Sequence, residues 1–265
     1  MKRNGSPRLG GCLPDPPDDR DYAVEATLQQ QMVHPISYEP SMLPPRNQLG
    51  LGACVAFAAT GAREAMEAIW RPRRLPQEKL SVLDLYKQIK EMDRWPHSEG
   101  TSPRFAMKVL QTSGQAQQKA CPYATEFPPT RETEFWGKGH RRYERIVSYH
   151  RIRTIQDGRR ALCELGPWMV GIPVGRSILQ ADGPDVLRVP EAHALLGGHA
   201  LCIYGWDERG FLVQNSWGRG WRRDGRAVLP FAYLRSIPWW DGWAMDVVGE
   251  EPRCEVQHVT AEGNQ

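Results

Sequence analysis

Apolar and small residues recur with a helical period between residues 54 and 70. This stretch contains six alanines, which are strong helix formers, and Phe57, Gly61 and Ala65 stand four residues apart. Pro72 follows closely and disfavours a longer helix. The pattern predicts a buried central helix.

Two more stretches with a helical pattern follow. SVLDLYKQIKEMD covers residues 81–93, and its first residue, Ser81, is a suitable N-cap. SPRFAMKVLQTSG covers residues 102–114 and closes on a glycine, which is typical of a helix C-terminus. The first half of the chain is therefore predicted to be helical.

After about Tyr143 the pattern changes to that of strands. Segments rich in β-branched and aromatic residues are separated by turn signals such as DERG and RDG. The predicted strands are RIVSYHRI (145–152), PWMVGIPV (167–174), HALCIYGW (199–206), GFLVQNSW (210–217) and GWAMDVV (242–248). Helices first and strands second predict an α+β protein with two lobes that face one another.

The two ends of the chain differ from its middle. Residues 7–45 are dense in proline and aspartate, as in LPDPPDDRDY, and this composition predicts an extended strap that crosses the surface. The polar residues beyond Glu250 predict a disordered tail. We therefore expect an N-terminal strap (1–43), a folded domain (44–250) with a helical lobe (about 46–140) and a strand lobe (about 141–250), and a tail (251–265).

Composition narrows the classes of partner. Lys and Arg number 34 against 31 Asp and Glu, and the net charge of +3 is too small to indicate a nucleic-acid partner. No stretch has the roughly 18 apolar residues of a membrane helix, and the charged N-terminus lacks the apolar run of a signal peptide. We expect a globular protein, cytoplasmic or exported without a cleavable signal peptide, with no membrane partner.

The six cysteines are scattered along the chain. They form neither a CxxC pair for a metal nor the regular spacing of a disulfide-rich scaffold, so we expect mostly free thiols and no metal site. Cys12 and Cys121 lie in polar, proline-flanked segments and are expected to have no role.

Cys54 is the candidate nucleophile. If the central helix begins at Cys54, its side chain lies where free backbone N–H groups and the helix dipole favour a thiolate. Gly50, Gly52 and Ala53 before it allow another backbone to approach closely. Cysteine is also among the most buried residue types, so packing alone would explain it. A nucleophile requires a partner base.

His199 is the candidate base. It opens a strand with alternating pattern, and the DERG turn leads the chain back antiparallel to Asn215, so the two residues are predicted to lie roughly opposite on one face. An asparagine amide would fix the orientation and tautomer of the imidazole and leave its other nitrogen facing a thiol. Cys202 is an odd number of residues from His199 and is predicted to point into the core.

These segments resemble the papain family of cysteine peptidases. QLGLGACVAF, from Gln48, looks like the family's Q-x-x-x-x-[small]-C-x-A-F segment, and NSWGRGW, from Asn215, looks like its N-S-W-G-x-G-W segment. His199 and Asn215 follow Cys54 by 145 and 161 residues, close to the roughly 130 to 150 typical of papain-like enzymes. DPPDDRDY and SEGTSPRFAMKVL resemble segments of bacterial members.

The resemblance implies a papain-like two-lobe fold with an active cleft between the lobes. Cys54 would lie on the helical left lobe, and His199 and Asn215 on the strand-rich, barrel-like right lobe. Gln48 and the Cys54 backbone N–H would form the oxyanion hole, and Trp217 would shield the histidine–asparagine contact from water. The expected substrate-binding residues are Gly100, Gly171, Gly198 and Trp217.

Two positions depart from the family pattern. Leu51 stands where many members have a disulfide-forming cysteine, and Val55 replaces the bulky aromatic residue that usually follows the nucleophile. The residues before the domain are also too few for the long inhibitory propeptide of the lysosomal members.

The sequence predicts a cysteine-type peptidase that hydrolyses peptide bonds by Cys-His-Asn acyl transfer, without a cofactor. Its expected partner is a protein or peptide substrate, with a sizeable apolar residue accommodated over Gly171. A proteinaceous inhibitor or immunity partner stays open. The alternatives are a papain-fold transferase or deamidase, including an exported toxin or effector, and a catalytically silent peptidase-derived binding module.

Overall fold

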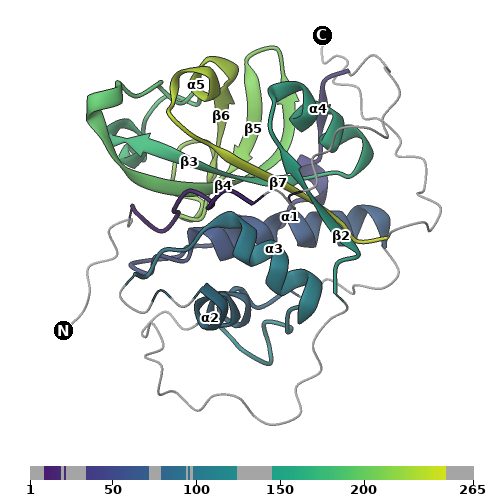
Figure 1. Cartoon of the computed structure of the whole chain (residues 1–265). Coiled ribbons are helices and arrows are strands. Elements are labelled where there is room, and N and C mark those ends of the chain that lie inside the picture. The colour runs from purple at the N-terminus through teal and green to yellow at the C-terminus, as the bar shows by residue number, and fades with distance from the viewer. Residues whose placement is uncertain are drawn as a thin grey trace.

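An antiparallel sheet with three helices against one of its faces organises the chain (Figure 1). The computed structural model describes residues 9–18, 21, 34–71, 79–93, 95, 98–123 and 145–248. This arrangement confirms the predicted α+β class. The predicted tail lies outside the described residues.

The three helices predicted in the first half of the chain are confirmed. They are α1 (Cys54–Trp70), α2 (Val82–Asp93) and α3 (Pro103–Thr112). The Ser81 hydroxyl accepts a hydrogen bond from the Asp84 backbone N–H at 3.0 Å, as expected of an N-cap. Beyond α3, Gly114 has φ of +72°, a conformation that glycine adopts at little cost.

The sheet has seven strands, all paired antiparallel. They are β1 (Ile36–Ser37), β2 (Ser148–Ile152), β3 (Trp168–Gly175), β4 (Leu195–Asp207), β5 (Gly210–Gln214), β6 (Arg226–Pro230) and β7 (Asp241–Asp246). The order is β2-β7-β3-β4-β5-β6, and β1 pairs with β4. The five predicted strands correspond to β2, β3, β4, β5 and β7, whereas the short β1 and β6 were not predicted.

Two helices in the strand-rich half were also not predicted. They are α4 (Ile155–Glu164) and α5 (Phe231–Ser236), and three 3₁₀ turns accompany the fold at Glu39–Ser41, Arg176–Leu179 and Ala192–Ala194. The start of α4 carries a local signal, because Thr154 and Asp157 form a reciprocal capping box. That signal lies between two strands and was overlooked.

The sheet separates two hydrophobic cores. On one face of β4, Ala200, Cys202 and Tyr204 pack in the core that includes α1, α2 and α3. On the other face, Leu201 and Ile203 pack in the core that includes residues of α4 and α5. The alternation along one strand therefore supplies both cores, and the predicted core position of Cys202 is confirmed.

The described start of the N-terminal strap is extended and only partly covered: Gly11 and Cys12 are buried, whereas Gly10 and the prolines at 14, 16 and 17 are exposed. Residues 9–18, the darkest purple segment of Figure 1, pass between the sheet and the helices, whereas Ile36–Ser37 pair with β4 as β1. The side chain of Cys12 is only 1% exposed. The composition correctly indicated an extended chain, but proline and aspartate content does not say which surface an extended chain follows.

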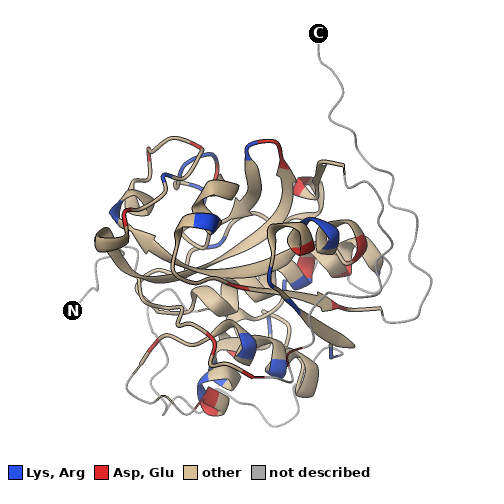
Figure 2. Cartoon of the chain, turned by 45° about the horizontal axis from the view of Figure 1, so that its top comes forward, with Lys and Arg blue, Asp and Glu red and all other residues tan. Residues whose placement is uncertain are grey.

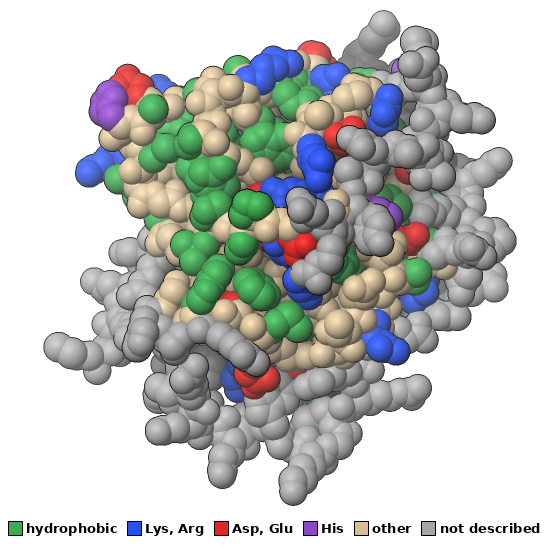
Figure 3. Space-filling model, in the orientation of Figure 1, with side chains coloured by type: hydrophobic (Ala, Val, Ile, Leu, Met, Phe, Trp, Pro, Cys, Tyr) green, Lys and Arg blue, Asp and Glu red, His purple; other side chains and the backbone are tan. Residues whose placement is uncertain are grey.

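The outer surface carries charges of both signs. Figure 2 shows Lys and Arg interspersed with Asp and Glu around the described chain. Hydrophobic side chains gather toward the sheet on the face shown in Figure 3, with charged side chains beside them. None of the helices in the described residues combines the length and apolar character needed to cross a membrane.

Candidate active site

Cys54 is the first residue of α1 and is fully buried. Burial raises the pKa of its thiol to about 12, although the backbone N–H groups of Ala200, Val55 and Cys54 itself act in the opposite direction. The helix N-terminus is therefore aimed at the sulfur as predicted. While the strap covers the site, however, desolvation raises the thiol pKa by more than the backbone N–H groups lower it. The thiol is therefore favoured over the expected thiolate.

His199 lies on β4, with Ile172 of β3 as its pairing partner. Its Nε2 is 2.7 Å from Oδ1 of Asn215, and the same oxygen accepts a hydrogen bond from the Ser216 backbone N–H at 2.7 Å. An amide oxygen only accepts, so Nε2 carries the proton and Nδ1 is unprotonated in the neutral ring. Burial lowers the pKa of His199 to about 4, against the bond to Asn215, which raises it.

The second ring nitrogen of His199 is a buried atom without a hydrogen-bond partner among the residues described. The bond to Asn215 occupies Nε2, so the lone pair of Nδ1 stays available. Nδ1 is therefore the atom left to receive or donate a proton in the site.

The register between β4 and β5 differs from the predicted one. Cys202 pairs with Gln214, and an irregularity between Ile203 and Gly205 shifts the pairing along the hairpin. Asn215, directly after β5, is therefore displaced by two positions from the residue opposite His199. The side chains still meet because a shift of two keeps both on the same face.

Trp217 covers this contact. Its ring centroid lies 4.7 Å from that of His199, with the planes tilted by 35°, and Trp221 meets the Trp217 ring edge-on at 5.8 Å. Asn215 is only 3% exposed beneath them. Excluding water strengthens a hydrogen bond, so the position fits the predicted shield.

Gln48 is fully buried, and its side-chain amide is held at both ends. Its Nε2 donates to the Leu51 carbonyl at 2.8 Å, and its Oε1 accepts from the Ser216 hydroxyl at 2.5 Å. The Leu51 carbonyl can only accept, so the amide orientation is fixed. Ser216 is a supporting residue that the sequence analysis missed, although it stands inside the NSWG segment.

The strap lies directly over the candidate nucleophile. Gly10 N–H and Cys12 N–H both donate to the Gly198 carbonyl, at 3.0 and 3.4 Å, and Thr101 N–H donates to the Gly11 carbonyl at 3.2 Å. A Cβ atom added to Gly11 would lie 2.8 Å from the Cys54 sulfur. The chain's own backbone therefore occupies the position in which a substrate backbone was expected.

The glycines predicted to bind substrate all contact this strap. A Cβ atom on Gly100 would lie 2.4 Å from the Gly10 carbonyl oxygen, and one on Gly198 would lie 2.0 Å from the Cys12 carbonyl oxygen. A Cβ atom on Gly171 would lie 2.6 Å from the Cys12 sulfur. Each glycine thus permits a backbone or side chain to approach where a larger residue would collide.

Two cysteines in polar, proline-flanked segments are buried. Cys12 and Cys121, which were expected to be incidental, are 1% and 5% exposed. Cys12 fills the space above Gly171 beside the cleft, and Cys121 accepts a bond from Ser81 through its carbonyl at 2.5 Å. Local polarity did not predict this burial because both cysteines are covered by segments that are distant in the sequence.

The part of the chain that the structure describes has no cluster of three or more metal-ligating side chains.

Comparison with known proteins places this arrangement in a family. The family description "Papain family cysteine protease" matches residues 37–229, which include every residue of the candidate site. The chain belongs to this family. The papain-family assignment and the α+β fold agree with the expectation from the two sequence segments.

Individual papain-family members are distant in sequence. Mouse cathepsin J is 24% identical over 196 residues, covering 71% of this chain and 56% of cathepsin J. An uncharacterized peptidase C1-like protein of Acanthamoeba polyphaga mimivirus is 31% identical over 102 residues, covering 35% and 32%. The chain thus spans about half or less of the length of these two relatives.

Solved structures show the same fold. Xylellain, a cysteine protease from Xylella fastidiosa, matches with a TM-score of 0.77 and 24% identity over 94% of this chain and 98% of its own. A procathepsin B from Trypanosoma congolense matches with a TM-score of 0.72 and 17% identity, covering 90% and 86%.

Proposed function

We propose that the protein is a cysteine peptidase that cleaves peptide bonds with Cys54, His199 and Asn215. Family membership supports a cysteine protease. The observation that carries the assignment of residues is the 2.7 Å bond from His199 to Asn215, which leaves His199 Nδ1 without a partner among the residues described. The Cys54 thiol, at the N-terminus of α1, interacts with the backbone N–H of Ala200, the residue next to His199.

Catalysis begins with proton transfer from the Cys54 thiol to His199 Nδ1. The thiolate attacks the carbonyl carbon of the substrate, and the protonated His199 then gives its proton to the amine nitrogen as the C–N bond breaks. Water attacks the resulting thioester with His199 as the base, which releases the acid and restores the thiol. Asn215 keeps the imidazole in the required tautomer throughout.

The negative charge that develops on the substrate oxygen needs donors. The Cys54 backbone N–H lies at the start of α1, where it has no partner within the helix. The Gln48 Nε2 has a second N–H besides the one bonded to Leu51. These two donors supply the proposed oxyanion hole, and the fixed Gln48 amide is ready without reorganisation.

The covered state cannot accept a substrate, because Gly11 lies over the sulfur. Removing the strap would also hydrate the two catalytic groups, whose pKa values burial has moved apart. We therefore propose a latent enzyme whose reactive ion pair forms when the strap leaves the cleft.

The test is the intact mass of the Gly11→Ala chain, in which the added Cβ would collide with the Cys54 sulfur and open the cleft, after treatment with a peptidyl epoxide that alkylates activated thiols. We expect one adduct at Cys54, none in the Cys54→Ala protein, and a large loss of rate in the His199→Ala protein. Hydrolysis of a peptide library should disappear in the same two variants. Hydrolysis that persists in Cys54→Ala would contradict the assignment.

A further inference from the structure

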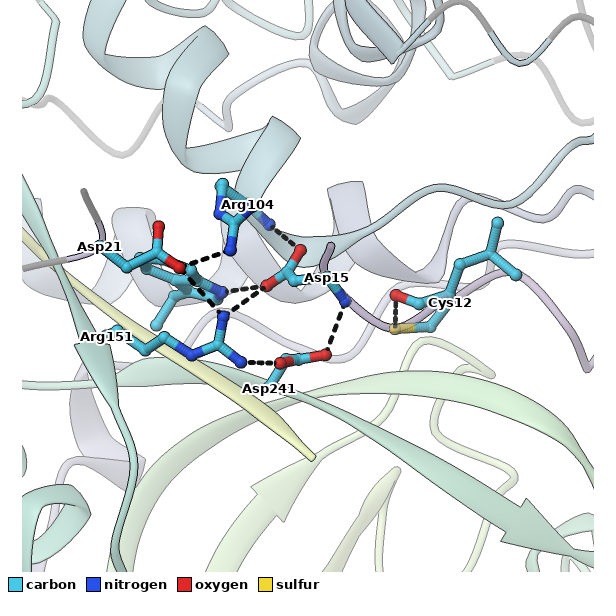
Figure 4. A network of polar contacts seen from close by, with 8 residues as sticks. Cys12, Asp15, Asp21, Arg104, Arg151 and Asp241 are labelled. Atoms are coloured by element: carbon cyan, nitrogen blue, oxygen red, sulfur yellow. Dashed lines mark hydrogen bonds and ion pairs between the residues drawn. The ribbon is translucent and has the colours of Figure 1, made fainter. Parts of the chain in front are cut away.

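The strap is anchored beside the cleft by a group of charged side chains. Asp15 and Asp21 of the strap meet Arg104 of α3, Arg151 of β2 and Asp241 of β7, and we call these five residues the strap clamp (Figure 4). Both aspartates belong to the segment DPPDDRDY, whose side chains had no predicted role. The clamp joins three elements that are far apart in the sequence.

Asp15 makes the most specific contacts of the clamp. Its two carboxylate oxygens accept from the Arg104 backbone N–H at 2.9 Å and from the Trp243 indole N–H at 2.6 Å. Its own backbone N–H donates to the Asp241 carboxylate at 2.9 Å, and Arg151 approaches its carboxylate at 3.7 Å. Asp15 therefore fixes the strap three residues after Cys12.

Asp21 contacts both arginines. Its carboxylate forms an ion pair with the Arg104 guanidinium and another with Arg151 at 3.2 Å, and the Asp21 and Arg104 side chains are each only 6% exposed. Both guanidinium groups also lie over the Trp243 ring, at 5.7 and 5.3 Å from its centroid. Each arginine is therefore held in place by Trp243 of β7 as well as by the strap.

The balance of charges in the clamp depends on the strap. The strap supplies Asp15 and Asp21, and the rest of the clamp supplies Arg104, Arg151 and Asp241. Without the strap, the two arginines would have only the Asp241 carboxylate within the clamp, in a partly desolvated site. Unpaired buried charge is costly, so this end of the cleft favours an additional carboxylate.

We propose that Arg104 and Arg151 form a carboxylate-binding site whose occupation by Asp15 and Asp21 keeps the strap over Cys54. The contacts of the strap inside the cleft hold it less strongly than the clamp does, because Gly10 and Gly11 form only backbone hydrogen bonds and are conformationally flexible. Charge-assisted bonds are roughly twice as strong as neutral ones. The proposal rests on the proposed function only for its consequence, which is control of access to the nucleophile.

The test measures strap release directly in the full chain. Cys12 belongs to the strap and is buried while the strap lies in the cleft. Its alkylation by iodoacetamide, measured by peptide mapping, therefore reports release of the strap and does not require enzymatic activity. Asp21→Asn is the first variant, because among the residues that the structure describes its carboxylate contacts only the two arginines named above. We expect at least a tenfold faster labelling of Cys12, about the factor for one charge-assisted bond lost.

Two further variants calibrate the measurement. Asp207→Asn makes the same chemical change in the exposed ion pair with Arg209 and should label at the unaltered rate. Gly11→Ala should open the strap by collision, since the added Cβ would also lie 2.9 Å from the Gly52 carbonyl oxygen. Asp21→Glu keeps the charge and should restore much of the slow labelling.

Labelling of Asp21→Asn at the parental rate, while Gly11→Ala labels fast, overturns the clamp. The peptidyl epoxide provides the separate readout for the proposed function. If Cys12 becomes accessible in Asp21→Asn but Cys54 never reacts with the epoxide, the clamp stands and the peptidase assignment fails. If both thiols react faster, the clamp controls access to the enzyme.

Discussion

Single residues in the site depend on neighbours that are remote in sequence. Gln48 and Ser216 are fixed by one 2.5 Å bond across 168 positions, and His199 reaches Asn215 across a hairpin. The residue types and their order in the chain identified the candidate triad. They could not identify the orphaned Nδ1 or the bond that fixes the Gln48 amide, because both depend on atoms that only the folded chain brings together.

Gln48→Ala should lower turnover without unfolding the protein. Removing one oxyanion donor costs about 3 kcal/mol of barrier, so kcat should fall by roughly a hundredfold or more. The measurement is kcat in the Gly11→Ala background, where the cleft is expected to be open, with the exposed Gln180→Ala as matched control. Unchanged turnover in Gln48→Ala would remove Gln48 from the mechanism, and a reduced urea midpoint would reveal a structural cause instead.

At the scale of elements, hydrophobic periodicity predicted correctly the elements that are long and have a regular residue pattern. The bounds of α1 were predicted as observed, and β3 and β4 were recognised from their branched residues. α4 was missed because Gly158 and a short apolar stripe weaken its pattern. Tertiary contacts explain that glycine, since a Cβ there would lie 2.6 Å from Trp168 and 2.9 Å from Phe211.

Gly158→Ala should therefore destabilise the fold. In an exposed helix the change to alanine would be favourable by about 1 kcal/mol, but overpacking against two buried aromatic rings costs about 1 to 3 kcal/mol. We expect a lower free energy of unfolding in urea. The control is Gln156→Ala, an exposed position of the same helix, which should change stability little. A more stable Gly158→Ala protein would contradict this prediction and show that α4 can move away from Trp168 and Phe211 at little cost.

At the scale of the whole molecule, the strap determines the chemical state of the site. With the strap in place, burial holds the pKa of Cys54 at about 12 and that of His199 at about 4. Both groups are then neutral between those values. Opening the cleft admits water, which favours the charged forms and moves the Cys54 pKa down and the His199 pKa up.

The pH dependence of Cys54 alkylation by iodoacetamide should report this change. Since only the thiolate reacts, the rate in the parent protein should keep rising by about tenfold per pH unit through neutral and mildly alkaline pH. In Gly11→Ala the rise should begin at lower pH and then level off. The measurement is peptide mapping across the pH range, with Gly220→Ala as control because its Cβ position is open. Identical profiles in Gly11→Ala and the parent would contradict control by the strap.

The sequence by itself determined the central helix, the main strands and the spacing of Cys54, His199 and Asn215, because these follow from local periodicity and residue chemistry. Only the tertiary structure decided where the strap lies. Proline and aspartate specify an extended, charged segment, but its position depends on Arg104, Arg151 and Trp243, which come from three separate elements. The covered nucleophile and its neutral thiol follow from that packing, which no local pattern records.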